Sequence, residues 1–174
     1  MDATDRKLLG ILQHDAALSL DALSERVGLS RNACWRRVKR LEDDGIIRAR
    51  VTLLDAGRIN VGLTAFITLR ATEHSAKWLS QFSRAVRDIP EIVGVYRMTG
   101  DVDYLLQAVI PDVAAYDQLY KRLIGKITLA DVSSSFVMEQ IKATTVLPLD
   151  YAEDRKSHEP TADRVARRVV ASDD

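Results

Sequence analysis

The stretch LSERVGLSRNACWRRVKRLEDDG, residues 23–45, decides the architecture of the N-terminal part of the chain. Ser30 is a good N-cap for a helix that runs toward Gly45. The buried stripe expected for that helix consists of Cys34, Val38 and Leu41. Gly28 suits the left-handed residue that follows a helix end, so a second helix stops just before Ser30. Two helices joined by so tight a link are typical of a helix-turn-helix, whose second helix enters the DNA major groove.

Another short helix is expected before this pair. Apolar side chains at helical spacing predict it between a cap at Asp2 or Thr4 and a polar break at His14. Ser19 is the N-cap candidate for the helix that ends at Gly28. Three helices therefore fill the first 45 residues.

The outward face of the third helix carries the candidate DNA-reading side chains. On a helical wheel of about 100° per residue, Asn32, Arg36 and Lys39 lie opposite the buried stripe. Arginine makes bidentate contacts to guanine and asparagine to adenine, while serine and lysine suit phosphates. The candidate DNA-binding residues are Ser30, Arg31, Asn32, Trp35, Arg36, Lys39 and Arg40. Arg37 lies nearer the buried stripe, so we expect it to form an ion pair or to lay its stem along apolar surface.

Charge alone does not identify a nucleic-acid binder. The chain has 25 basic and 25 acidic residues, so it has no overall positive field. Residues 31–50 nevertheless hold seven basic side chains against three acidic ones. Such a charge run is often only a solvated helix face. The N-cap, the glycine turn, the preceding helix and an exposed Trp35 at DNA-reading spacing favour DNA binding.

The rest of the composition narrows the class of protein further. The single cysteine, Cys34, cannot form an internal disulfide or a multi-thiolate metal site, which fits a reducing cytoplasm. No apolar run is long enough for a membrane span, and the N-terminus has no signal-peptide pattern, so no membrane association is expected. His14, His74 and His158 lie far apart, and no nucleotide-binding glycine motif occurs. No catalytic residue, metal or cofactor is therefore expected.

The pattern changes after Gly45. Residues 46–54 (IIRARVTLL) alternate as an extended segment. The expected elements after it are strand 64–71, helix 75–88, strand 91–98, strand 104–110, helix 112–125 and strand 132–147. The order βαββαβ predicts a ferredoxin-like sandwich, in which two helices cover one face of an antiparallel sheet. The uncovered face usually meets another subunit.

These observations predict an α+β protein whose chain is divided into four segments. Residues 1–50 form a helix-turn-helix (winged) DNA-binding domain, and residues 51–63 form an extended linker. Residues 64–152 form the ferredoxin-like oligomerisation domain, to which the family resemblance given below adds effector binding. Residues 153–174 contain no aromatic, leucine or isoleucine side chain, so we expect a disordered tail.

Several stretches resemble the Lrp/AsnC family of bacterial transcription regulators. Residues 4–55 resemble its N-terminal domain through DRKLLGILQHDA and LSERVGLSRNACWRRVKRLEDDGII. MTGDVDYLL and SSSFVMEQIKATTVLPL resemble its effector-sensing domain. Within the family, CWRRVKRLEDDGI, SSFVMEQIK and TTxLP most resemble the cysteine-detoxification activators. The resemblance implies three kinds of partner: double-stranded DNA, a small amino acid with cysteine as first candidate, and further copies of the chain in a homo-oligomer (a dimer, with an octamer built from dimers).

The turn at residues 99–104 (TGDVDY) has two possible roles. Glycine and aspartate are ordinary hairpin residues, so by themselves they indicate only a tight turn. The resemblance implies that this turn binds an amino acid where dimers meet, with Asp101 or Asp103 as the partner of the ammonium group. The effector-binding residues it implies are Met98, Thr99, Gly100, Asp101, Asp103 and Tyr104, with Ser133, Ser134 and Ser135 from a neighbouring subunit.

The alternative that stays open is a small ferredoxin-like enzyme or ligand-binding module. Its N-terminal helices would then serve only for assembly. Salt-dependent binding to an operator-sized duplex distinguishes the two classes.

Overall fold

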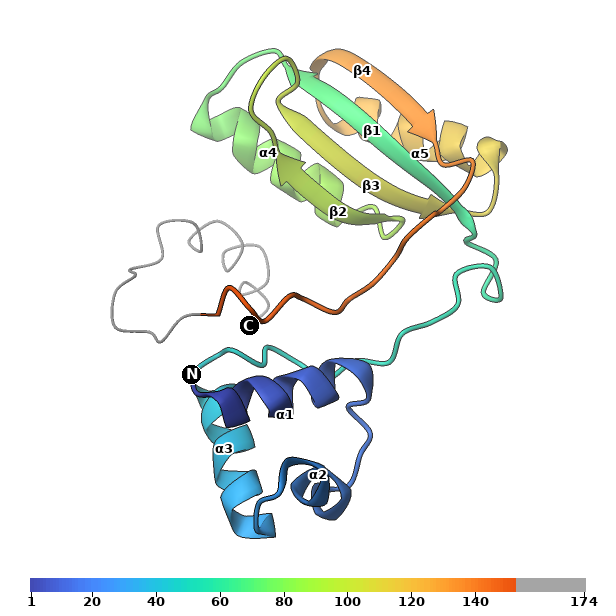
Figure 1. Cartoon of the computed structure of the whole chain (residues 1–174). Coiled ribbons are helices and arrows are strands. Elements are labelled where there is room, and N and C mark those ends of the chain that lie inside the picture. Colours follow the sequence, from blue (N-terminus) through green and yellow to red (C-terminus); the bar gives the residue numbers. More distant parts are fainter. Residues whose placement is uncertain (153–174) are drawn as a thin grey trace. The chain divides into compact units, whose positions relative to one another are not determined.

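The computed structural model describes residues 1–152, which form two compact units (Figure 1). The first unit contains residues 1–52 together with the segment that begins at Lys142, and the second contains residues 53–141. The tail expected at residues 153–174 lies outside the described residues.

The first unit contains the three expected helices. They are α1 (Ala3–His14), α2 (Leu20–Val27) and α3 (Arg31–Asp43). Asp2, Ser19 and Ser30 cap them through their side chains, and Gly28 has the left-handed φ of 72° that ends α2. The predicted helix-turn-helix is therefore confirmed. Its small core is formed by Leu8, Leu23, Val27, Cys34 and Val38.

A segment from the far end of the sequence completes this unit. Residues 142–152, the C-terminal strap, lie along α1. The Gln13 amide donates to the Leu147 carbonyl oxygen at 3.2 Å and accepts from the Leu147 N–H at 2.7 Å. Arg6 Nη1 donates to the Ala152 carbonyl oxygen at 3.2 Å. The expected boundary at residue 152 therefore differs from the observed one, because these contacts attach the strap to the first unit.

The second unit is the expected βαββαβ sandwich. Its elements are β1 (Leu63–Ala71), α4 (Ala76–Arg87), β2 (Ile92–Arg97), β3 (Tyr104–Ile110), α5 (Val113–Lys126) and β4 (Leu129–Phe136). The strands lie in the order β2-β3-β1-β4, and every neighbouring pair is antiparallel. The two edges of the sheet are therefore β2 and β4.

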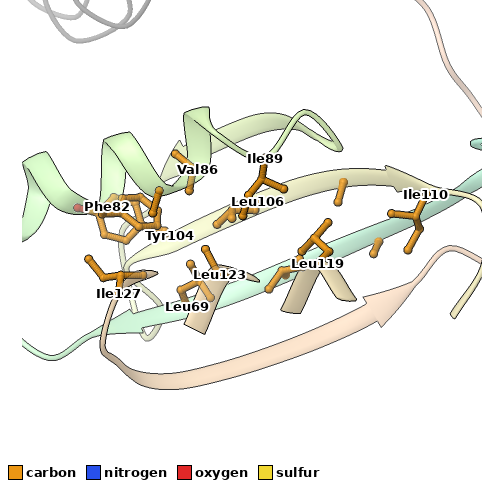
Figure 2. Close-up of a cluster of buried hydrophobic side chains, with 14 of the residues drawn as sticks. Leu69, Phe82, Val86, Ile89, Tyr104, Leu106, Ile110, Leu119, Leu123 and Ile127 are labelled. Atoms are coloured by element: carbon orange, nitrogen blue, oxygen red, sulfur yellow. The ribbon is translucent and has the colours of Figure 1, made fainter. Parts of the chain in front are cut away.

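The core of the second unit lies between the two helices and one face of the sheet (Figure 2). Alternate residues of β1 and β3 supply the sheet side, among them Leu69, Tyr104, Leu106 and Ile110. Helix α4 contributes Trp78 and Phe82, whose rings stack with centroids 5.1 Å apart. Helix α5 closes the layer with Leu119 and Leu123.

The intervening residues of the strands form the uncovered face. On β1 these are Thr64, Phe66, Thr68 and Arg70. Their register partners are Val109, Gln107 and Leu105 on β3, and Ser135, Ser133 and Asp131 on β4. Contact of this face with another subunit remains a prediction.

Two expected extended segments differ from the structure. Residues 46–54 form no strand, because they have no pairing partner within the described chain. Strand β4 ends at Phe136 rather than near Leu147. Its only neighbour is β1, whose first residue is Leu63, and Ala65 already pairs with Phe136. The residues beyond Val137 therefore have no strand to join.

Candidate nucleic-acid interface and effector turn

Helix α3 presents a continuous exposed face. Cys34, Val38 and Leu41 are buried, as expected. Asn32, Arg36 and Lys39 are exposed on the opposite side, and Trp35 is 55% exposed beside them. Ser30 caps the helix by accepting a hydrogen bond from the Ala33 N–H at 3.3 Å. A cationic helix with a free aromatic ring suits a DNA groove.

Most cations of this helix already have an acidic partner. Arg31 lies 3.4 Å from Asp21, and the Lys39 ammonium lies 2.8 Å from the Asp43 carboxylate. Both pairs are exposed, so they are weak and easily exchanged for phosphate. Within residues 1–152, the side chains of Asn32 and Arg36 form no hydrogen bond or ion pair. The two residues best suited to base edges are therefore available.

A second set of charges joins α1 to α3. Asp5 is 1% exposed and accepts hydrogen bonds from Arg37 at 2.8 Å and from Arg40 at 2.6 Å. Asp2 accepts from Arg37 at 2.6 Å. The ion pair expected for Arg37 is thus confirmed. Arg40, expected to contact DNA, is instead bound to a carboxylate of the neighbouring helix.

The negative charge of Asp2, the N-cap of α1, is expected to make the stability of the protein depend on pH in the acid range. The pKa of Asp2 falls from 3.8 to about 2, first through the hydrogen bond from the Asp5 backbone N–H and then through Arg37. Because the folded pKa is the lower one, the stabilisation is full above the unfolded pKa and is lost as the pH falls toward about 2. Thermal unfolding of wild type and Asp2→Asn checks this, because asparagine keeps the cap without the charge. We expect the difference in Tm between the two proteins to shrink from near-neutral pH to pH about 2. A difference that stays constant over this range would contradict the expectation.

The candidate effector turn, residues 98–104, is a hairpin between β2 and β3. The Met98 N–H donates to the Asp103 carbonyl oxygen at 2.8 Å, and Gly100 has a φ of 101°, which favours glycine. The Asp103 carboxylate accepts from the Ala71 N–H at 2.8 Å, and its other oxygen lies 3.7 Å from His74 Nε2. Asp103 therefore fastens the turn to the end of β1.

The other residues of the turn differ in exposure. Met98, Thr99, Gly100 and Asp101 are exposed. Within residues 1–152, the Asp101 carboxylate has no ion-pair partner. Tyr104 is buried against Phe82, with ring centroids 4.5 Å apart. Of the two aspartates considered for an ammonium group, Asp101 is the one left available.

The three serines of β4 do not share a face. Ser133 and Ser135 are exposed on the uncovered face, in register with Thr68 and Phe66. Ser134 points to the helix side, where its hydroxyl is hydrogen-bonded to Tyr116 Oη. The alternation of side chains along a strand separates them. Ser134 and Tyr104 are thus turned toward the interior of their own unit.

The described part of the chain offers neither a metal site nor a membrane-spanning helix. Residues 1–152 contain no cluster of histidine, cysteine, aspartate and glutamate side chains that could hold a metal ion. No helix among them is long and apolar enough to cross a membrane.

Comparison with known proteins decides the family. A model of winged helix-turn-helix DNA-binding domains matches residues 1–48, and a model of the Lrp/AsnC ligand binding domain matches residues 64–147. The DNA-binding transcriptional activator DecR of Escherichia coli is 49% identical over 86% of this chain and 99% of its own. The chain belongs to the Lrp/AsnC family.

Solved Lrp/AsnC structures show the same fold. An AsnC family transcriptional regulator from Agrobacterium tumefaciens is 56% identical, with a TM-score of 0.84 over 87% of this chain and 99% of its own. A transcriptional regulator from Neisseria meningitidis, solved as a complex with L-Met, is 40% identical. Its TM-score is 0.83 over 88% of this chain and 99% of its own.

Family membership establishes the class of function. This Lrp/AsnC chain is a DNA-binding transcription regulator with an amino-acid ligand-binding domain. It is not an enzyme, because its relatives are regulators of transcription. The alternative of a ferredoxin-like enzyme is therefore set aside.

One residue of this Lrp/AsnC site was missed by sequence reasoning. Asp5 contacts two arginines of α3, 32 and 35 positions away in the sequence. A local signal exists, because Asp2 and Asp5 have capping-box spacing. That spacing accounts for the backbone contact of Asp5 and gives no hint of its arginine partners.

Proposed function

We propose that α3 reads an operator through Asn32, Trp35 and Arg36, while Ser30, Arg31 and Lys39 contact phosphates. The observation that carries this proposal is the pair Asn32 and Arg36, one helical turn apart and without partners in residues 1–152, beside a half-exposed Trp35. Arg40 is left out of this set because its guanidinium is bound to Asp5.

The active species is a dimer, and dimers assemble further, with the octamer as the expected form. A single helix of this length offers few base contacts, and two-fold symmetry doubles them. The uncovered sheet face, which includes Phe66 and Tyr96, offers apolar surface for such contacts. Size-exclusion chromatography with light scattering tests the assembly, and a monomer at micromolar concentration contradicts it. We place the protein in the cytoplasm, with the chromosomal DNA that it reads.

The effector is a free amino acid bound at the turn of residues 98–104 where dimers meet. Ser133 and Ser135 of a neighbouring subunit complete this site, while Ser134 and Tyr104 support it from the interior. Cysteine is the first candidate, since the resemblance to cysteine-detoxification activators implies it. Methionine is the second, because the Neisseria meningitidis relative was solved with L-Met. Discrimination between small side chains is worth only about 1 to 3 kcal/mol, so we expect modest selectivity.

A DNA titration tests the proposed function as a whole. Full-length protein is titrated by fluorescence anisotropy against duplex DNA from its own gene neighbourhood, over a series of salt concentrations. A scrambled duplex of equal length is the control. We expect tighter binding to the genomic duplex and a linear fall of log K with log salt. Equal affinity for both duplexes at every salt concentration would refute operator reading.

Replacement of Asp101 with alanine is expected to weaken amino-acid binding about 10- to 100-fold, the worth of a hydrogen bond to a charged group. Asp101 has the available carboxylate, because that of Asp103 is fastened to Ala71. Isothermal calorimetry with all twenty amino acids, on wild type and on the variant, measures this. Glu139→Ala is the matched control, since it removes an exposed carboxylate elsewhere in the same unit. Undiminished binding by Asp101→Ala, or no binding by wild type, contradicts the assignment.

A further inference from the structure

Asp5 is the one acidic side chain buried in the core of the described DNA-binding unit. Burial of a carboxylate is costly unless positive partners and hydrogen bonds accompany it. Asp5 has both: each of its oxygens accepts from an arginine of α3, Oδ1 from Arg37 at 2.8 Å and Oδ2 from Arg40 at 2.6 Å. Oδ2 also accepts from the Asp2 backbone N–H at 3.1 Å.

The partner arginines are themselves close to the reading face. Arg40 lies one helical turn after Arg36, so its side chain starts about 40° away from that of Arg36 around the helix axis. Its side chain is 52% exposed although its guanidinium is tied to Asp5. An arginine in this position would contact a DNA phosphate if it were released, because phosphate attracts any nearby cation.

We propose that Asp5 is a specificity-determining residue, which withholds Arg37 and Arg40 from the DNA backbone. The inference rests on the proposed reading of DNA by α3. Asp5 acts through these arginines and touches no base. Its carboxylate holds Arg40, and together with the carboxylate of Asp2 it holds Arg37. Two cations that would bind every sequence equally are thus kept from phosphate, and the sequence-dependent contacts are left to Asn32 and Arg36. It also fixes the rotation of α3 against α1.

The salt dependence of random DNA binding measures this withholding. Each phosphate neutralised adds about 0.9 to the slope of log K against log salt. We expect Asp5→Asn to bind a random-sequence duplex several-fold more tightly at low salt, with a slope steeper by about 0.9 for each arginine released. Its preference for the genomic duplex over the random one should fall. A loss of structure alone would not make random binding tighter.

Two further proteins separate released arginines from a simple change in net charge. Asp15→Asn removes the same charge from an exposed site of the same unit. Within residues 1–152 this carboxylate accepts a hydrogen bond from the Ala17 N–H and holds no arginine. We expect its slope to match wild type. Asp5→Asn combined with Arg40→Gln should lose the part of the added slope that Arg40 supplies, about 0.9, whereas Arg37 keeps Asp2 as a partner. An unchanged slope in folded Asp5→Asn, or an equal increase in Asp15→Asn, would overturn the proposal.

A single replacement of Arg40 keeps the test decisive if Asp5→Asn does not fold, as judged by circular dichroism. Because the guanidinium is withheld, Arg40→Gln in the wild-type background should leave the random-duplex slope unchanged. A slope lower by about 0.9 would show that Arg40 contacts phosphate and that Asp5 does not withhold it. If α3 does not read an operator, the result is different, because wild type then binds the genomic and the random duplex equally well.

Discussion

Replacement of Arg36 with alanine is expected to cost about 1 to 3 kcal/mol of operator affinity at each half-site. In a dimer the substitution is made twice, so affinity should fall by about 30-fold or more. Arg36 is exposed opposite the buried stripe of α3 and has no partner within residues 1–152, so its loss costs DNA contacts and little folding stability. Anisotropy with the genomic duplex measures the loss, and a panel of single-base changes should show relaxed preference at one position.

Lys39→Ala is the matched control for this measurement. It removes a cation from the same exposed face, where the Lys39 ammonium is paired with Asp43. We expect it to lower the salt slope by about 1 while the base preference stays the same. Wild-type operator affinity in Arg36→Ala would show that α3 does not read bases through this residue.

Phe82→Ala is expected to destabilise the second unit by about 3 to 5 kcal/mol, the usual cost of truncating a buried aromatic side chain. Phe82 is 2% exposed and packs against Trp78 and Tyr104, and Figure 2 shows it beside Tyr104 at one end of the core. Tyr104 is also the last residue of the effector turn. The cavity left by the Phe82 ring should therefore loosen the turn as well. Amino-acid binding should weaken together with the loss of folding stability.

Urea unfolding followed by tryptophan fluorescence measures this effect, because Trp78 stacks directly on Phe82. Leu79→Ala is the control on the same helix, since Leu79 is 44% exposed. Its effect should stay within about 0.5 kcal/mol. A loss in Phe82→Ala no larger than that of Leu79→Ala would contradict a stabilising role for this buried ring.

The helix boundaries could be predicted because helix caps are local in sequence. Ser19, Ser30 and Ser75 each accept a hydrogen bond from the backbone N–H three residues ahead. Such a pattern can be found without knowledge of the rest of the chain. The antiparallel sheet with two helices on one face followed from the element order βαββαβ, since few connections are possible.

The features that sequence missed depend on distant partners. The sequence predicted a strand to about residue 147, but β4 stops at Phe136, beside the beginning of β1. Ser134 and its neighbours have the same residue type, and only the pleat of β4 turns Ser134 toward Tyr116. The role of Asp5 depends on arginines more than 30 positions away. Contacts of this range are not encoded in any local pattern.

The C-terminal strap has a consequence for how the protein is made. Gln13 and Leu147 are 134 positions apart, so the DNA-binding unit is discontinuous in sequence. The strap is synthesised after the whole second unit, which is the ligand-binding domain. At typical rates of synthesis this is on the order of ten seconds after the three helices. Helix α1 therefore lacks its contacts with the strap until synthesis of the chain is nearly complete. A nascent chain whose ligand-binding domain is incomplete therefore also lacks the strap of its DNA-binding unit. Every molecule with a complete DNA-binding unit also contains the whole ligand-binding domain.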